Sequence, residues 1–220
     1  MNEAMVGFNA MDNSRIHGGH RWGSLLLLCL ALSPIVGSPV TAYSGTWEEV
    51  AKLTANDGAL NDRLGHSVAI SGNTAAIGTP FKEGLRGAVY VFERDANGAW
   101  TLAKKVTAMV PLANASFGES VAVDGDRLIV GSPGTNFDKG SAYVFERDSG
   151  GPNNWGQVAE LTANDGAGSD RFGISVGISG DTVVVGAFND DLDDVGSDQN
   201  GSAYVFEPNG ANWSQITKLH

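Results

Sequence analysis

Residues 171–188 read RFGISVGISGDTVVVGAF, and two other stretches of the chain are built in the same way. They begin at Leu64-Gly65 and Phe117-Gly118. Each first segment (HSVAIS, ESVAVD or ISVGIS) alternates apolar with small or polar residues, which is the period-two pattern of a β-strand. The connections SGN, DGD and SGD tolerate the positive φ of a tight hairpin turn, and a second apolar segment ending in glycine follows each of them. The stretch therefore predicts a β-hairpin that occurs three times.

The repeat extends well beyond this hairpin. Four tryptophans are spaced by 53, 55 and 58 residues, at Trp47, Trp100, Trp155 and Trp213. A third strand recurs as AVYVFERD, SAYVFERD and SAYVFEPN, and a fourth begins at the tryptophan. Four short strands in a unit of about 50 residues, without helical periodicity between them, are typical of a β-propeller blade.

We therefore expect an all-β fold with about three blades, near 64–108, 117–163 and 172–219, and an extra strand at 47–54. Closed propellers have four or more blades, because each blade is covered by its neighbours. Three blades predict a partial or open propeller in the region 43–220. Its end faces would be covered either by a second copy, in a homo-oligomer, or by missing blades of a longer chain.

Two short motifs carry a family resemblance. Phe-Gly heads the first strand, and Gly-Thr-Pro at 78–80 or Gly-Ser-Pro at 131–133 ends the second. This arrangement resembles the FG-GAP repeat of integrin α heads and of bacterial secreted proteins, although Leu64 and Phe188 depart from the pattern. The resemblance covers residues 47–219 and implies binding of proteins or matrix outside the cell, sometimes with calcium.

Residues 1–42 are predicted to be a signal peptide. Arg15 and Arg21 precede an apolar run, Leu25 to Leu32, which is much shorter than the roughly 20 residues of a membrane span. The protein should thus be secreted, periplasmic or on the cell surface, without membrane insertion after cleavage. Its only cysteine, Cys29, lies in this leader, so the mature chain can form no disulfide. The net charge of −11 excludes nucleic acid as a partner.

The segment GISVG at 173–177 matches the G-x-S-x-G pattern of a hydrolase nucleophile. However, the same serine recurs in the other repeats as Ser67 and Ser120, at the start of a strand. A catalytic serine is a single residue supported by a histidine and an acid. We therefore predict a structural role for Ser175, and no enzyme.

The loop 188–202 is the candidate metal site, with five aspartates: Asp190, Asp191, Asp193, Asp194 and Asp198. Calcium takes six to eight oxygen ligands, and closely spaced aspartates can supply several of them. The calcium loop of integrin-type repeats lies between the first two strands, which here is a tight turn, so those ligands do not carry over. Two interpretations stand: a separate calcium site, or a solvated acidic loop.

Two further features are assigned to structure. Asn-Asp-Gly linkers carry Asp57 and Asp62 before the first blade and Asp165 and Asp170 before the third, where we expect them to brace the loops. The recurrence of tryptophan at one strand position favours packing over a sugar-binding platform.

The sequence as a whole predicts a non-enzymatic extracellular or cell-surface module for binding, adhesion or scaffolding, with calcium as its one candidate cofactor. Its partner would be a protein or matrix ligand that the sequence does not name. The alternative is an accessory repeat region, or a fragment, of a larger secreted hydrolase.

Overall fold

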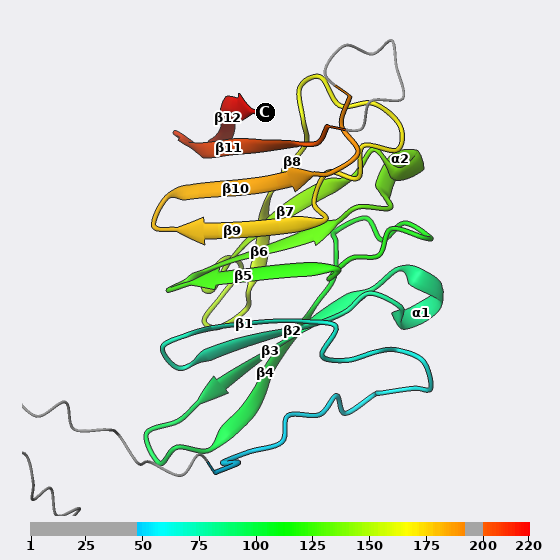
Figure 1. Ribbon diagram of the computed structural model, residues 1–220. Helices are drawn as coiled ribbons and strands as arrows, with labels where there is room; N and C mark the ends of the chain where they lie inside the picture. The colour runs from blue at the N-terminus through cyan, green and yellow to red at the C-terminus, as the bar shows by residue number, and fades with distance from the viewer. Residues whose placement is uncertain (1–47, 192–199) are drawn as a thin grey trace, which may run out of the picture. The chain divides into compact units, whose positions relative to one another are not determined.

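The computed structural model describes residues 48–191 and 200–220, which form three four-stranded antiparallel sheets (Figure 1). The predicted signal peptide, Trp47 and three aspartates of the acidic loop (Asp193, Asp194 and Asp198) lie outside the described residues. Sheet 1 contains β1 (Ser67–Ser71), β2 (Thr74–Thr79), β3 (Ala88–Arg94) and β4 (Trp100–Val106). Sheet 2 contains β5 (Ser120–Asp124), β6 (Arg127–Ser132), β7 (Ser141–Glu146) and β8 (Gly156–Leu161). Sheet 3 contains β9 (Ser175–Ser179), β10 (Thr182–Ala187), β11 (Ser202–Asn209) and β12 (Asn212–Leu219).

Each sheet is a meander whose spatial order follows the chain, from the first strand to the fourth. The register is also repeated, because Ser67, Ser120 and Ser175 each pair with the glycine that is next to last in the neighbouring strand. The third and fourth strands shift register at the same place in all three sheets, immediately before the phenylalanine of the YVFE or YVFER segment. The predicted all-β fold of three open, blade-like sheets is confirmed.

The sheets pack against one another through the phenylalanine of the Phe-Gly motif. The first strands β1, β5 and β9 are in contact in this order, and Figure 1 shows them side by side. Phe117 is 1% exposed and lies in the core between sheets 1 and 2, while Phe172 is fully buried between sheets 2 and 3. Phe117 contacts the rings of Tyr143 and Phe145, with centroids 5.5 and 5.9 Å away. The Phe117–Phe145 pair is edge-to-face, and such pairs add to the free energy that area burial supplies.

The glycine after this phenylalanine fixes how closely two sheets approach. A Cβ on Gly78 would lie 2.1 Å from the carbonyl oxygen of Gly118, and one on Gly131 would lie 1.9 Å from that of Gly173. The same two carbonyls accept hydrogen bonds of 2.8 Å from the hydroxyls of Ser67 and Ser120. Only glycine at the end of the second strand leaves space for the next repeat's backbone.

Two features differ from the sequence prediction. Residues 48–54, which belong to the extra strand expected at 47–54, have no strand assignment. A strand requires a hydrogen-bonded neighbour, and within the described residues no sheet precedes sheet 1 to supply one. Two short helical segments, α1 (Lys82–Leu85) and α2 (Thr135–Asp138), contain residues with positive φ and follow the second strands of sheets 1 and 2. Among the described residues, no helix has the length and apolarity that crossing a membrane requires.

Replacing either junction phenylalanine should be costly. Phe117→Ala and Phe172→Ala should each lower the free energy of unfolding by about 3–5 kcal/mol, because each opens a cavity between two sheets. Leu64→Ala is the matched control, since the half-buried Leu64 occupies the same repeat position without a preceding sheet. Urea unfolding followed by circular dichroism measures all three, and equal losses would contradict this assignment.

Candidate functional site

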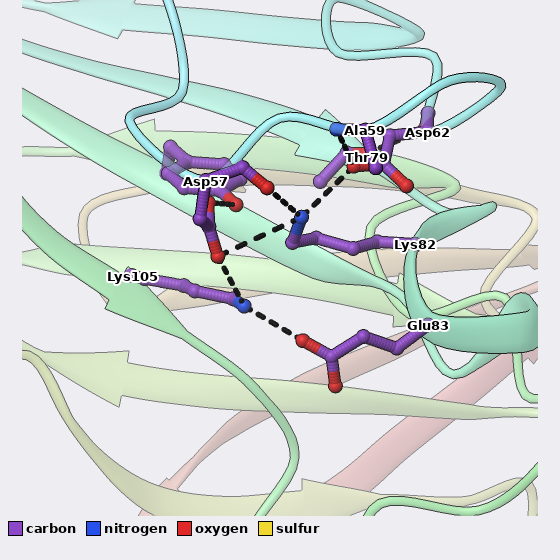
Figure 2. Close-up of polar contacts among 8 residues, drawn as sticks. Asp57, Ala59, Asp62, Thr79, Lys82, Glu83 and Lys105 are labelled. Carbon is purple, nitrogen blue, oxygen red and sulfur yellow. Dashed lines mark hydrogen bonds and ion pairs between the residues drawn. The ribbon is translucent and has the colours of Figure 1, made fainter.

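Five charged side chains and one tyrosine gather beside sheet 1, in a group we call the first acid–lysine cluster: Asp57, Asp62, Lys82, Glu83, Lys105 and Tyr90 (Figure 2). Lys82 lies at its centre, with a side chain only 5% exposed. Its Nζ is 2.8 Å from a carboxylate oxygen of Asp62 and 3.6 Å from one of Asp57. This buried ammonium is therefore neutralised by two acids of the preceding linker.

A second lysine closes the cluster from the fourth strand. Lys105 Nζ lies 2.9 Å from Asp57 and 2.8 Å from Glu83. Tyr90, which pairs with Lys105 on the neighbouring strand, donates its hydroxyl hydrogen to Asp57. One network thus holds together the linker before the sheet, the α1 segment and two strands.

The pKa values in the cluster follow from these contacts. Hydrogen bonds from Tyr90 and Lys105 lower the pKa of Asp57 to about 2. The hydrogen bond from Lys82 lowers the pKa of Asp62. Burial and the bond to Asp57 raise the pKa of Tyr90, so this phenol stays protonated. All these shifts favour the charge states that attract one another, as expected for a bracing network.

Sheet 3 carries an equivalent network, the second acid–lysine cluster, which consists of Asp165, Asp170, Asp190, Tyr204 and Lys218. Lys218 Nζ is 2.7 Å from Asp165 and 2.8 Å from Asp190. Asp190 is 3% exposed, and its other oxygen accepts a 2.9 Å hydrogen bond from the hydroxyl of Tyr204.

In the second cluster, burial disfavours the charged forms of the side chains, and the hydrogen bonds between Lys218 and the acids favour them. Burial alone would lower the pKa of Lys218, but hydrogen bonds with Asp165 and Asp190 raise it. Burial alone would raise the pKa of Asp190, but hydrogen bonds with Lys218, Ser202 and Tyr204 lower it. Asp170 differs, because burial and the nearby charge of Asp190 raise its pKa.

Sheet 2 lacks such a cluster, and the three repeats together explain why. Lys105, Glu160 and Lys218 occupy one position, in register with Tyr90, Tyr143 and Tyr204 respectively. A lysine occurs where the preceding linker has Asp57 or Asp165, whereas Glu160 occurs where the linker has Val110. Glu160 instead accepts hydrogen bonds from Ser141 and Tyr143.

The predicted bracing role of the linker aspartates is confirmed. Lysines from α1 and the fourth strands pair with Asp57, Asp62 and Asp165. Asp170 instead accepts a hydrogen bond from the backbone amide of Ala167. Sequence reasoning missed Lys82, Lys105 and Lys218. The sequence did contain a signal for two of them. A lysine stands five residues after Trp100 and after Trp213, in the repeats with an Asn-Asp-Gly linker, whereas Glu160 stands five residues after Trp155.

The structure describes two of the five predicted calcium ligands, Asp190 and Asp191. Asp190 binds Lys218, Ser202 and Tyr204 through its carboxylate, so a cation of the protein already lies beside it. Asp191 is half-buried, and the other three aspartates fall outside the described residues. Within 48–191 and 200–220, no three acids or histidines are grouped so that they could hold a metal ion. Calcium binding in this loop remains a prediction.

The serine at the head of each first strand belongs to the junctions between sheets. Ser67 and Ser120 donate to glycine carbonyls of the next repeat, and Ser175 occupies the corresponding position in β9. His66 is hydrogen bonded to Glu119 at 3.0 Å, and His220 lies 3.2 Å from Ser202. Neither of these contacts forms part of a Ser-His-Asp arrangement around Ser175.

The tryptophans pack as predicted, to different degrees. Trp155 is 1% exposed within the core between sheets 1 and 2, with the guanidinium of Arg147 4.8 Å from its ring centre. Trp100 and Trp213 are half-buried, each beside an arginine.

The middle repeat presents a different surface, because its linker and its α2 segment carry four exposed apolar side chains that we call the apolar loop patch: Met109, Val110, Leu112 and Phe137. These side chains are 73, 69, 39 and 95% exposed. Leu112 and Phe137 line a shallow pocket of about 430 Å³ together with Asn114, Gly134 and Asn136. Met109 and Val110 occupy the positions of Asn56-Asp57 and Asn164-Asp165 in the other linkers, so the patch replaces a charged network.

Removing the buried carboxylate of the second cluster should destabilise the chain. Asp190→Asn should lower the free energy of unfolding by about 1.5–3 kcal/mol, because Lys218 loses a charged hydrogen-bond partner. The exposed Glu49 supplies the control, and Glu49→Gln should stay within about 0.5 kcal/mol of the parent. A loss in denaturant unfolding no larger than that of the control would contradict the pairing.

Acid should weaken the first cluster. Because the folded pKa of Asp57 is about 2 and its ordinary value is 3.8, its contribution is complete above about pH 4 and is lost as pH falls towards 2. The free energy of unfolding, measured at intervals from pH 6 to pH 2, should therefore decline in this window. Asp57→Asn should make the decline shallower, and an unchanged slope would contradict the role of Asp57.

Comparison with known proteins agrees with the repeated geometry. The family model of the FG-GAP repeat matches three segments, 47–92, 100–145 and 155–206. Each match begins at a tryptophan, so the second and third start in the last strand of one sheet and continue into the first three strands of the next. No curated protein matches the chain. The three matches cover more than half of the sequence, and the chain belongs to the FG-GAP repeat family.

Proposed function

We propose that this protein is a non-enzymatic binding or scaffold module of the cell exterior. FG-GAP repeats are typical of extracellular and cell-surface proteins. The recurring serines, glycines and aromatic residues are engaged in packing the repeats, and the acid–lysine clusters are paired internally. These contacts support a rigid frame whose loops are available for a ligand.

The observation that carries the proposal is the apolar loop patch defined above. Its largest member, Phe137, is 95% exposed, and Met109 is 73% exposed. Large apolar side chains grouped on a surface mark sites of protein interaction, because water solvates them poorly. The flanking repeats carry Asp57 and Asp165, each paired with a lysine, at the position of Val110, so packing of the repeat does not require an apolar residue there.

The ligand favoured by such a patch is a protein or matrix surface with an apolar centre. Phe137 and Leu112 border the same pocket and would supply the buried centre of the contact. Asp138 and Asn136, which line the same pocket, would supply a polar rim. The net charge of −11 favours neutral or basic partners over anionic ones.

Binding can be tested with the protein immobilised on a sensor and a panel of purified matrix proteins and polysaccharides as analytes. The double variant Leu112→Asn and Phe137→Asn should weaken binding by about tenfold or more, which corresponds to about 1.4 kcal/mol. Asparagine suits the positive φ of 61° at Phe137, so the backbone should be retained. Leu60→Asn, which alters a side chain that is 90% exposed in another linker, is the control and should bind like the parent. Unchanged binding by the double variant would overturn the assignment of the patch.

The non-enzymatic part of the proposal has its own test. The protein should give no ester or lipid hydrolysis that Ser175→Ala removes. Ser120→Ala is the matched control, because Ser120 occupies the same repeat position. A hydrolase activity lost in Ser175→Ala and retained in Ser120→Ala would favour the alternative of a secreted hydrolase.

A further inference from the structure

The two outer sheets each have a face that is covered less completely than the inner faces. On sheet 1 the preceding segment packs Leu53, Ala55 and Leu64 against this face, but the first strand stays exposed. We call the side of sheet 1 away from sheet 2 the leading face, and the side of sheet 3 away from sheet 2 the trailing face. On the leading face, Val68 and Ile70 are 70 and 68% exposed, whereas Val121, the equivalent of Val68, is 9% exposed. On the trailing face, Val184 and Leu219 are 38 and 50% exposed, whereas their equivalents Ile129 and Leu161 are 0 and 2% exposed.

The trailing face keeps the glycines that admit a following repeat. In sheets 1 and 2, a Cβ on Gly87 or Gly140 would lie 2.0 Å from the carbonyl of the next repeat's phenylalanine. Gly201 holds the same position and a similar φ of +72°. Gly186 corresponds to Gly78 and Gly131, yet the closest atom to its Cβ position is the mobile hydroxyl of Ser175 at 2.3 Å. Gly186 thus leaves space for a backbone that none of the described residues provides, whereas at Gly201 the carbonyl oxygen of Phe188 lies 3.0 Å from the Cβ position.

The leading face offers the matching backbone. Leu64-Gly65 corresponds to Phe117-Gly118 and Phe172-Gly173, and Gly65 has a φ of +92°, close to the +90° and +91° of the other two. If sheet 1 of another molecule followed sheet 3, the Gly65 carbonyl would meet the hydroxyl of Ser175. This contact would repeat the 2.8 Å bonds from Ser67 to Gly118 and from Ser120 to Gly173.

Charge also matches across the two faces. At the junction of sheets 1 and 2, Arg147 binds Glu93 and donates a 2.7 Å hydrogen bond to Thr74. The trailing face retains the acceptors of that junction at equivalent positions, as Glu207 and Thr182. The leading face retains the donor as Arg94, whereas sheet 3 has Pro208 there. A junction between sheet 3 and a second sheet 1 would therefore have the same ion pair as the junction between sheets 1 and 2.

We infer that two copies of this chain assemble by docking the leading face of each on the trailing face of the other. Both docked junctions are alike, and together with the four internal junctions they give a closed ring of six sheets with a two-fold axis. Six blades lie within the range of closed propellers. The ring covers Val68, Ile70 and Val184 on both copies. Leu219 takes the place beside sheet 1 that Leu53, at the same repeat position, holds in the single chain.

The mass of the protein in solution tests this assembly. The chain produced from its full sequence in a secreting host should sediment as a discrete dimer at micromolar concentration. Val68→Asp and Val184→Asp should each convert it to a monomer with unchanged circular dichroism, because both residues are exposed in the single chain. Val158→Asp, in β8 of the middle sheet and at a position that is 38% exposed, is the control and should leave the dimer intact.

Charge reversal tests the register of the docked faces. Arg94→Glu and Glu207→Arg should each raise the dimer dissociation constant by about tenfold or more, and the double variant should recover most of this loss. Recovery would identify the pair, since a general loss of folding could not be reversed by a second reversal.

A parent protein that remains monomeric at all concentrations would overturn the proposal. A concentration-dependent series of larger species would also overturn it, because the faces would then join without closing. A dimer that survives both aspartate substitutions would place the interface elsewhere on the chain.

Discussion

The approach of one repeat's Phe-Gly backbone to the glycine of the preceding repeat is the contact on which the rest of the fold depends. A glycine carbonyl lies where a Cβ on Gly78 or Gly131 would be, and a serine hydroxyl binds it from the preceding sheet. This contact sets the distance between sheets and buries Phe117 and Phe172 between them. The phenylalanine, the glycine after it, the serine and the glycine of the second strand all lie in the recurring segment. Three copies of the segment therefore specify three similarly packed sheets.

The charged clusters act at a second level, by joining linkers to finished sheets. Lys82, Lys105 and Lys218 are each paired with acids from segments far away in the sequence. Buried ion pairs contribute little net free energy, but removing one partner costs much more, so they specify the loop conformation rather than drive folding. The linker of the middle repeat lacks these paired acids and instead has the exposed apolar side chains of Met109 and Val110. The fold and the proposed binding surface therefore depend on different positions of the same repeat.

Much of this architecture could be predicted from the sequence, because the repeats provide their own internal comparison. The hairpin turns, the four-stranded sheets and the structural role of the serine position all follow from features that recur. Residues 48–54 of the extra strand predicted at 47–54 form no strand, since strand propensity cannot supply the neighbour that a strand must pair with. The lysine partners of Asp57 and Asp165 were missed because they depend on contacts between the linker and a strand that begins more than 40 residues later. Asp190 illustrates the same limit, because its acidic neighbours in sequence suggested a metal whereas its neighbours in space include Lys218.

Hydrogen exchange at single-residue resolution tests the central contact most directly. The amides of Phe117 and Phe172 donate to the carbonyls of Arg86 and Lys139, at 3.2 and 3.1 Å, across the junctions between sheets. If the junctions hold the fold together, these two amides should exchange as slowly as those of the central strands β6 and β7, through global unfolding. Exchange as rapid as that of residues 48–54, while the strands stay protected, would show that the sheets are stable without the junctions and would contradict the account.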